Sequence, residues 1–144
     1  MVVQLILGSG LIILTAIVAA LSWWGLEAFL NHTHSWVERQ PHGPKLTVVL
    51  CLAMLWSVAM VTASVWIWAL TLRVLEIFPT TEASVYFSLV VFTTLGFGDV
   101  LLPVEWRLLG GLAAANGLLV FGLLTAMLVE TLRQTRMRQR GRFQ

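Results

Sequence analysis

The chain has 144 residues, of which 58% are hydrophobic and 11% charged, and its mean hydropathy is +0.87. These values exclude a soluble globular domain, and the length fits one membrane domain rather than two folds. The single cysteine, Cys51, has no partner within the chain for a disulfide. The formal net charge of +2 becomes informative only through its distribution along the chain.

The first apolar segment, Val2 to Leu26, carries no charged side chain. As a helix it would reach about 37 Å, enough to cross a hydrocarbon core of about 30 Å. No basic region precedes it, so we expect residues 1–30 to form a retained transmembrane helix rather than a signal peptide. The run Gly8-Ser9-Gly10 would allow either close helix packing or a turn that faces lipid.

Residues 31–45 are polar and contain two prolines and a glycine, which predicts a loop. Its three histidines are His32, His34 and His42. Histidines can bind a metal or sense pH near neutrality. No cysteine or carboxylate cluster accompanies them, so we interpret the segment as a solvated loop.

A second expected span, the outer helix at residues 46–77, begins with 27 uncharged residues. Pro79 ends it, and Thr80 or Thr81 can cap a new helix over residues 81–92. That helix is about half as long as a membrane span requires. The chain must therefore enter the membrane and return on the same side, as a re-entrant loop.

The glycine-rich segment, residues 93–99, follows this short helix. It reads Thr93, Thr94, Leu95, Gly96, Phe97, Gly98 and Asp99. Glycine destabilises a helix and permits left-handed backbone. Non-helical backbone at membrane depth is tolerated only where protein buries it or where it lines a water-filled path. We interpret this segment as the selectivity filter of a cation channel.

The last expected span, the inner helix at residues 104–132, is followed by a basic tail at residues 133–144. The tail has five arginines: Arg133, Arg136, Arg138, Arg140 and Arg142. By the positive-inside rule the tail is cytoplasmic, which places the loop at residues 31–45 inside and the re-entrant loop and N-terminus outside. The arginines either bind anionic lipid headgroups or remain a solvated topology signal.

The glycine-rich segment resembles the filter signature of tetrameric potassium channels. The likeness extends from Leu46 to about Glu130, and Phe121 to Ala126 is similar to the inner helix of small bacterial two-helix potassium channels. It implies an all-α membrane protein with three transmembrane helices and one re-entrant pore helix. It further implies a homotetramer in the bacterial inner membrane, with K⁺ ions in the filter and no organic cofactor.

The same resemblance implies roles for individual residues. Ion binding falls to Thr94, Leu95, Gly96, Phe97 and Gly98, the first four as K⁺ ligands through their carbonyl groups. Filter support falls to Thr93, Asp99, Tyr86 and Phe87. Leu95 and Phe97 stand where valine and tyrosine are commonest, and neither change removes a carbonyl ligand. Val90 stands where some members carry a carboxylate, which leaves Asp99 without that partner.

In the inner helix, Leu118, Phe121 and Thr125 lie at i, i+3 and i+7 and share one face. By the resemblance this face lines the cavity and gate, and Gly117 lies at the hinge position. Asn116 is a polar side chain at membrane depth. We expect it either to contact the cavity or gate or to make an interhelical hydrogen bond that stabilises the tetramer.

Together these features predict a potassium-selective channel that passes K⁺ down its gradient. Two alternatives stay open: a weakly selective cation channel and a non-conducting membrane interaction subunit. No nucleophile–base pair or cluster of metal ligands lies within the expected spans, so an enzyme is not expected.

Overall fold

The computed structural model describes residues 1–32 and 42–140, and every regular element within them is a helix. The elements are α1 (Val2–His32), α3 (His42–Val74), α4 (Thr81–Phe92), the short 3₁₀ helix η1 (Val104–Trp106) and α5 (Arg107–Arg140). Helices α1, α3 and α5 are each long and apolar enough to cross a membrane. The expected all-α architecture, with three spans and one short helix, is confirmed.

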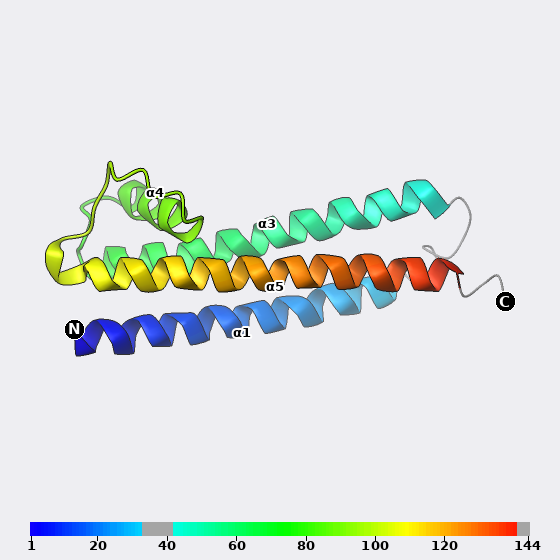
Figure 1. Ribbon diagram of the computed structural model, residues 1–144, viewed down its shortest axis with the longest axis horizontal. Helices are drawn as coiled ribbons and strands as arrows, with labels where there is room; N and C mark the ends of the chain where they lie inside the picture. The colour runs from blue at the N-terminus through cyan, green and yellow to red at the C-terminus, as the bar shows by residue number, and fades with distance from the viewer. Residues whose placement is uncertain (33–41, 141–144) are drawn as a thin grey trace.

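The three long helices form a bundle in which each packs against the other two (Figure 1). Helices α1 and α5 run in the same direction and α3 runs in the opposite direction. Helix α4 packs on α3 and α5 at the end of the bundle where α1 begins. The C-terminal end of α5 lies at the opposite end.

The core lies where α3, α4 and α5 meet. Trp68 of α3, Phe92 of α4 and Leu109 of α5 are at most 1% exposed. Many large apolar side chains instead cover the outside of the bundle, such as Ile6 and Leu55. Such a surface suits contact with lipid hydrocarbon rather than water.

Several helix boundaries differ from those expected, including the end of α1 at His32 and the start of α5 at Arg107 after η1. Helix α3 begins at His42 rather than after Lys45, because Pro44 falls in the first turn, where a missing N–H is tolerated. It ends at Val74 rather than at residue 77, because Glu76 adopts a left-handed conformation with φ 55°. Helix α5 continues to Arg140, so the described part of the basic tail is helical.

Candidate functional site

Residues at the start of α4 favour helix formation there. The Thr80 side chain accepts a hydrogen bond from the backbone N–H of Ala83 at 3.2 Å, which satisfies one of the free N–H groups at the helix start. Glu82 lies in the first turn, where a negative charge is favourable. The preceding turn is anchored by Phe78, whose ring centroid lies 5.2 Å from that of Phe87 on α4.

The glycine-rich segment begins as the C-terminal cap of α4. The N–H of Thr94 donates to the carbonyl of Val91, and the N–H of Leu95 donates to the carbonyl of Val90, both at 2.9 Å. Thr94 adopts φ 59°. This pair of bonds around a left-handed residue is the Schellman motif. The hydroxyl of Thr93 also donates to the carbonyl of Leu89 at 2.8 Å.

The backbone φ angle changes sign from one residue to the next along the segment. Thr94, Gly96 and Gly98 have positive φ angles of 59°, 60° and 77°, whereas Thr93 has φ −79° and neither Leu95 nor Phe97 has a positive φ. In a β-strand successive peptide groups alternate in direction. Reversing the backbone hand at every second residue allows successive carbonyl groups to face one side instead.

All seven residues of the segment are exposed in the single chain. The apolar side chains of Leu95 and Phe97 are 57% and 66% exposed. Backbone polar groups with no partner are costly at membrane depth. Such backbone is tolerated at membrane depth only where further protein surrounds it or where it lines a water-filled path.

Asp99, the last residue of the segment, is hydrogen-bonded to α4. The Tyr86 hydroxyl donates to the Asp99 carboxylate at 2.6 Å, and the N–H of Val100 donates to the same carboxylate at 3.0 Å. The Tyr86 bond, and to a lesser extent the backbone bonds, lower the pKa of Asp99 below its ordinary 3.8. Val90 is no partner for Asp99, but Tyr86 supplies one that the sequence did not reveal.

Phe87 differs from Tyr86 in its surroundings. It is buried at 6% exposure and packs on Phe78, and it also lies near Gly110 of α5. It thus holds α4 against the bundle. Of the two aromatic residues expected to support the segment, Tyr86 is the one that bonds to it.

Helix α5 packs tightly behind the end of α4 at Gly117. A Cβ atom at this position would overlap the carbonyl group of Phe92. Four residues later, the ring of Phe121 lies 6.3 Å from the ring of Phe92, centroid to centroid. The glycine expected as a hinge therefore also permits a close contact between the two helices.

The structure brings Leu118, Phe121 and Thr125 to one exposed face of α5. Asn116 does not share that face: its side chain is 2% exposed and bonds to Thr15 of α1. Two residues along a helix are about 200° apart, so Asn116 and Leu118 point in nearly opposite directions. Of the two roles expected for Asn116, the contacts support the interhelical hydrogen bond rather than contact with the cavity, and this bond lies within one chain.

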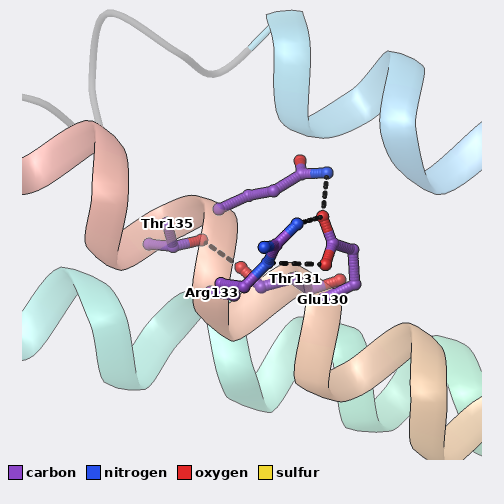
Figure 2. Close-up of polar contacts among 5 residues, drawn as sticks. Glu130, Thr131, Arg133 and Thr135 are labelled. Atoms are coloured by element: carbon purple, nitrogen blue, oxygen red, sulfur yellow. Dashed lines mark hydrogen bonds and ion pairs between the residues drawn. The ribbon is translucent and has the colours of Figure 1, made fainter.

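The far end of α5 carries a charge cluster, shown in Figure 2. The Glu130 carboxylate accepts from Arg133 Nε at 2.9 Å, from Arg133 Nη2 at 3.2 Å and from Gln134 at 2.9 Å. Spacings of three and four residues bring these side chains together on one helix. Glu130 and Arg133 thus form an ion pair on α5 before the helix ends at Arg140.

The remaining polar residues are placed less fully. Arg136 is exposed, and Arg138 and Arg140 lie in the last turn of α5. His32 ends α1 and His42 begins α3. His34 and Arg142 lie outside the described residues, so the idea of a histidine metal or pH site stays untested.

Sequence reasoning missed the residues through which α1 joins the bundle. Thr15 is fully buried against Asn116, and Ser22 bonds to Trp56 of α3. A signal for them was present, because polar and small residues recur in the first span at helical spacing.

A protein-family model described as an ion channel matches residues 46–134, which is more than half of the chain. The chain therefore belongs to this ion-channel family of two-helix pores, and it is an integral membrane protein. The match covers α3, the glycine-rich segment and most of α5, while α1 lies before it. Comparison with curated proteins and with solved structures found no match.

Proposed function

We propose that the protein is a potassium-selective channel whose filter is the glycine-rich segment. The observation that carries the proposal is the alternating hand of the backbone at Thr94, Gly96 and Gly98. A potassium ion that loses its water needs several oxygen dipoles at short range. Carbonyl groups turned to one side of a chain provide them without any charged side chain.

The K⁺ ligands in this proposal are the carbonyl groups of Thr94, Leu95, Gly96 and Phe97. The hydroxyl of Thr94 adds an oxygen at the inner end. Tyr86 and Asp99 hold the outer end of the filter by their 2.6 Å hydrogen bond.

One chain supplies one strand of carbonyl groups, whereas a closed ring needs several. We infer a homotetramer, in which neighbouring subunits cover the exposed side chains of Leu95 and Phe97. The exposed face of α5 with Leu118, Phe121 and Thr125 then lines the cavity below the filter. The C-terminal end of α5 is cytoplasmic, and Arg133 and Arg136 lie where anionic lipid headgroups can bind them.

The test is ion flux through the purified protein in vesicles, with K⁺ and Na⁺ compared. We expect K⁺ flux well above Na⁺ flux. Gly96→Ala should reduce it by about tenfold or more, because an L side chain at φ 60° is strained and the strain acts in every subunit. Gly10→Ala is the matched control, since Gly10 lies in α1 with open space around it.

Two results would contradict the proposal. Absence of flux in a folded protein would favour the non-conducting subunit. Equal K⁺ and Na⁺ permeability, read as a reversal potential in mixed salt, would favour the weakly selective cation channel.

A further inference from the structure

Helix α1 precedes the residues matched by the ion-channel family, yet it is fitted to the bundle along its length. Its inward side carries residues at alternating spacings of four and three, of which five are small or polar (Gln4, Gly8, Thr15, Ser22 and Gly25) and two are apolar (Leu11 and Val18). Its outward side carries large apolar residues such as Ile17 and Leu21, both more than half exposed. A polar side turned inward is expected where a helix in lipid binds other helices.

Among the described residues, side-chain hydrogen bonds join α1 to the other helices at three levels along its length. At the end near α4, Gln4 donates to the backbone carbonyl of Glu105. In the middle, Thr15 bonds to Asn116 of α5. At the far end, the Trp56 indole of α3 donates to the Ser22 hydroxyl at 2.7 Å.

The middle pair is the most deeply buried of the three. Thr15 is 0% and Asn116 is 2% exposed. Asn116 Nδ2 donates to the Thr15 hydroxyl at 2.8 Å. The hydroxyl hydrogen can in turn be donated to the carbonyl of Ile12 at 2.9 Å or to Asn116 Oδ1 at 3.1 Å. Neither residue has water to replace this partner at membrane depth.

The pair holds α5 at the level where α4 also holds it. Gly117, the next residue, is in contact with the carbonyl of Phe92 at the end of α4. Consecutive helix residues point about 100° apart. Asn116 and Gly117 therefore place α1 and α4 against two different sides of α5 at the same level along the helix. Nearer the N-terminal end of α5, Gly8 packs closely on Leu112. The N-terminal half of α5 therefore has no room to move toward α1.

Beyond the pair, toward the C-terminal end of α5, a groove of about 430 Å³ lies between α1 and α5. This is about three times the volume of an engineered cavity that holds benzene. The small side chains that open it are Ala16, Ala19, Ala20 and Ala126. Its lining is mainly apolar, so movement of α5 into it would exchange lipid contacts for helix contacts.

The direction of the groove relative to the pore follows from helix geometry. Asn116 points toward α1, and Leu118 of the proposed cavity face points about 200° away from it. Helix α1 and the groove therefore lie behind α5 as seen from the pore axis. A swing of the lower half of α5 away from the axis moves it into the groove and widens the inner mouth.

We propose that α1 is the support on which the inner helix moves. Thr15 is a positioning residue that fixes α5 at Asn116, and the groove below gives the C-terminal half of α5 room to swing outward. This inference rests on the proposed conduction through a pore lined by α5. It gives α1, which precedes the residues matched by the ion-channel family, a role in gating.

The first test fills the groove in the folded channel. Cys51→Ala with Ala20→Cys is reconstituted in planar bilayers, and single-channel currents are recorded before and after reaction with propyl methanethiosulfonate. Added bulk in a space needed for movement should lower the open probability by about fivefold or more. Unit conductance should not change, and reduction of the mixed disulfide should restore opening.

The matched control is Cys51→Ala with Ala63→Cys. Ala63 is an exposed alanine of α3 and does not line the groove. Its modification should leave the open probability unchanged. Complete modification of Ala20→Cys, measured by mass, with unchanged open probability would overturn the proposal. Absence of any current before modification would instead count against the proposed conduction itself.

The second test concerns the pair. Thr15→Val keeps the shape of the side chain and removes the hydroxyl, and it should shift the closed–open equilibrium by about threefold per subunit. Thr15→Ser should restore the equilibrium, and Ser22→Ala, which breaks a bond to α3 and not to α5, should not shift it. If Thr15→Val and Ser22→Ala both lower only the thermal stability of the channel, Thr15 is structural and the proposal fails.

Discussion

At the scale of single residues, the glycine-rich segment depends on three left-handed positions, of which two are glycines. Left-handed backbone at Gly96 and Gly98 could be predicted, because glycine adopts this conformation more readily than other residues. The left-handed conformation of Thr94 could not be predicted, because β-branched residues rarely take φ near 60°. Its conformation is held by the two capping bonds to Val90 and Val91, which depend on where α4 ends and not on the threonine.

The Tyr86–Asp99 bond predicts a response to acid. The pKa of Asp99 is lowered, so its contribution to stability is complete above the ordinary value of 3.8 and is lost as the pH falls through the lowered value. Tyr86→Phe removes the largest cause of the lowering. The acid-induced loss of current or of folded protein should therefore begin at a higher pH in this variant.

The measurement is the acid midpoint in wild type and in Tyr86→Phe, with external pH varied from 7 to about 3. Asp99→Asn is the control, because it lacks the titrating group and should show no acid transition from this site. Equal midpoints in wild type and Tyr86→Phe would show that the bond does not govern the pKa of Asp99.

At the scale of elements, α4 was predicted well because its signals are local. Pro79, the Thr80 cap and the glycines after Phe92 all lie within or beside it. The end of α5 was predicted poorly, because the tail is polar but contains no proline or glycine before Gly141, and its arginines and glutamines are good helix formers. The partner of Asn116 could not be predicted, because polarity at membrane depth does not say which helix supplies it.

The contact between α4 and α5 predicts opposite effects for two glycines of the same helix. Gly117→Ala should destabilise the protein by about 1–3 kcal/mol, because its Cβ meets the backbone of Phe92, which cannot yield as a side chain can. Gly122→Ala should be neutral or stabilising by up to about 1 kcal/mol, because its surroundings are open and alanine favours a helix.

These two variants are compared by thermal unfolding in detergent micelles. Because both changes add one methyl group to α5, helix propensity alone predicts the same sign for both. Stabilisation by both would mean that α4 and α5 are not in close contact at Gly117.

At the scale of the whole molecule, the exposed segment at residues 93–99 is the feature on which the proposal of several subunits rests. The fold of the single chain could be predicted from hydrophobic length and the short helix. The number of chains could not, because it depends on contacts between subunits. The proposed tetramer came from the family resemblance.

A mixing experiment counts the subunits. If one Gly96→Ala subunit disables a channel, equal amounts of wild-type and variant chain should leave about one sixteenth of the wild-type current, as random assembly of four predicts. Current is measured after co-expression at equal levels, with Gly10→Ala as the mixed control. A fall only to one half would indicate that each chain conducts alone.

The inward polar side of α1 has a consequence for the modularity of this channel. The family match suggests that residues 46–134 form a self-contained pore that could be cut out or transplanted. In this chain that piece would carry Asn116, the Trp56 indole and the Glu105 carbonyl without the partners they have in α1. Such groups are costly in hydrocarbon. We therefore expect removal of α1 to destabilise the remaining piece.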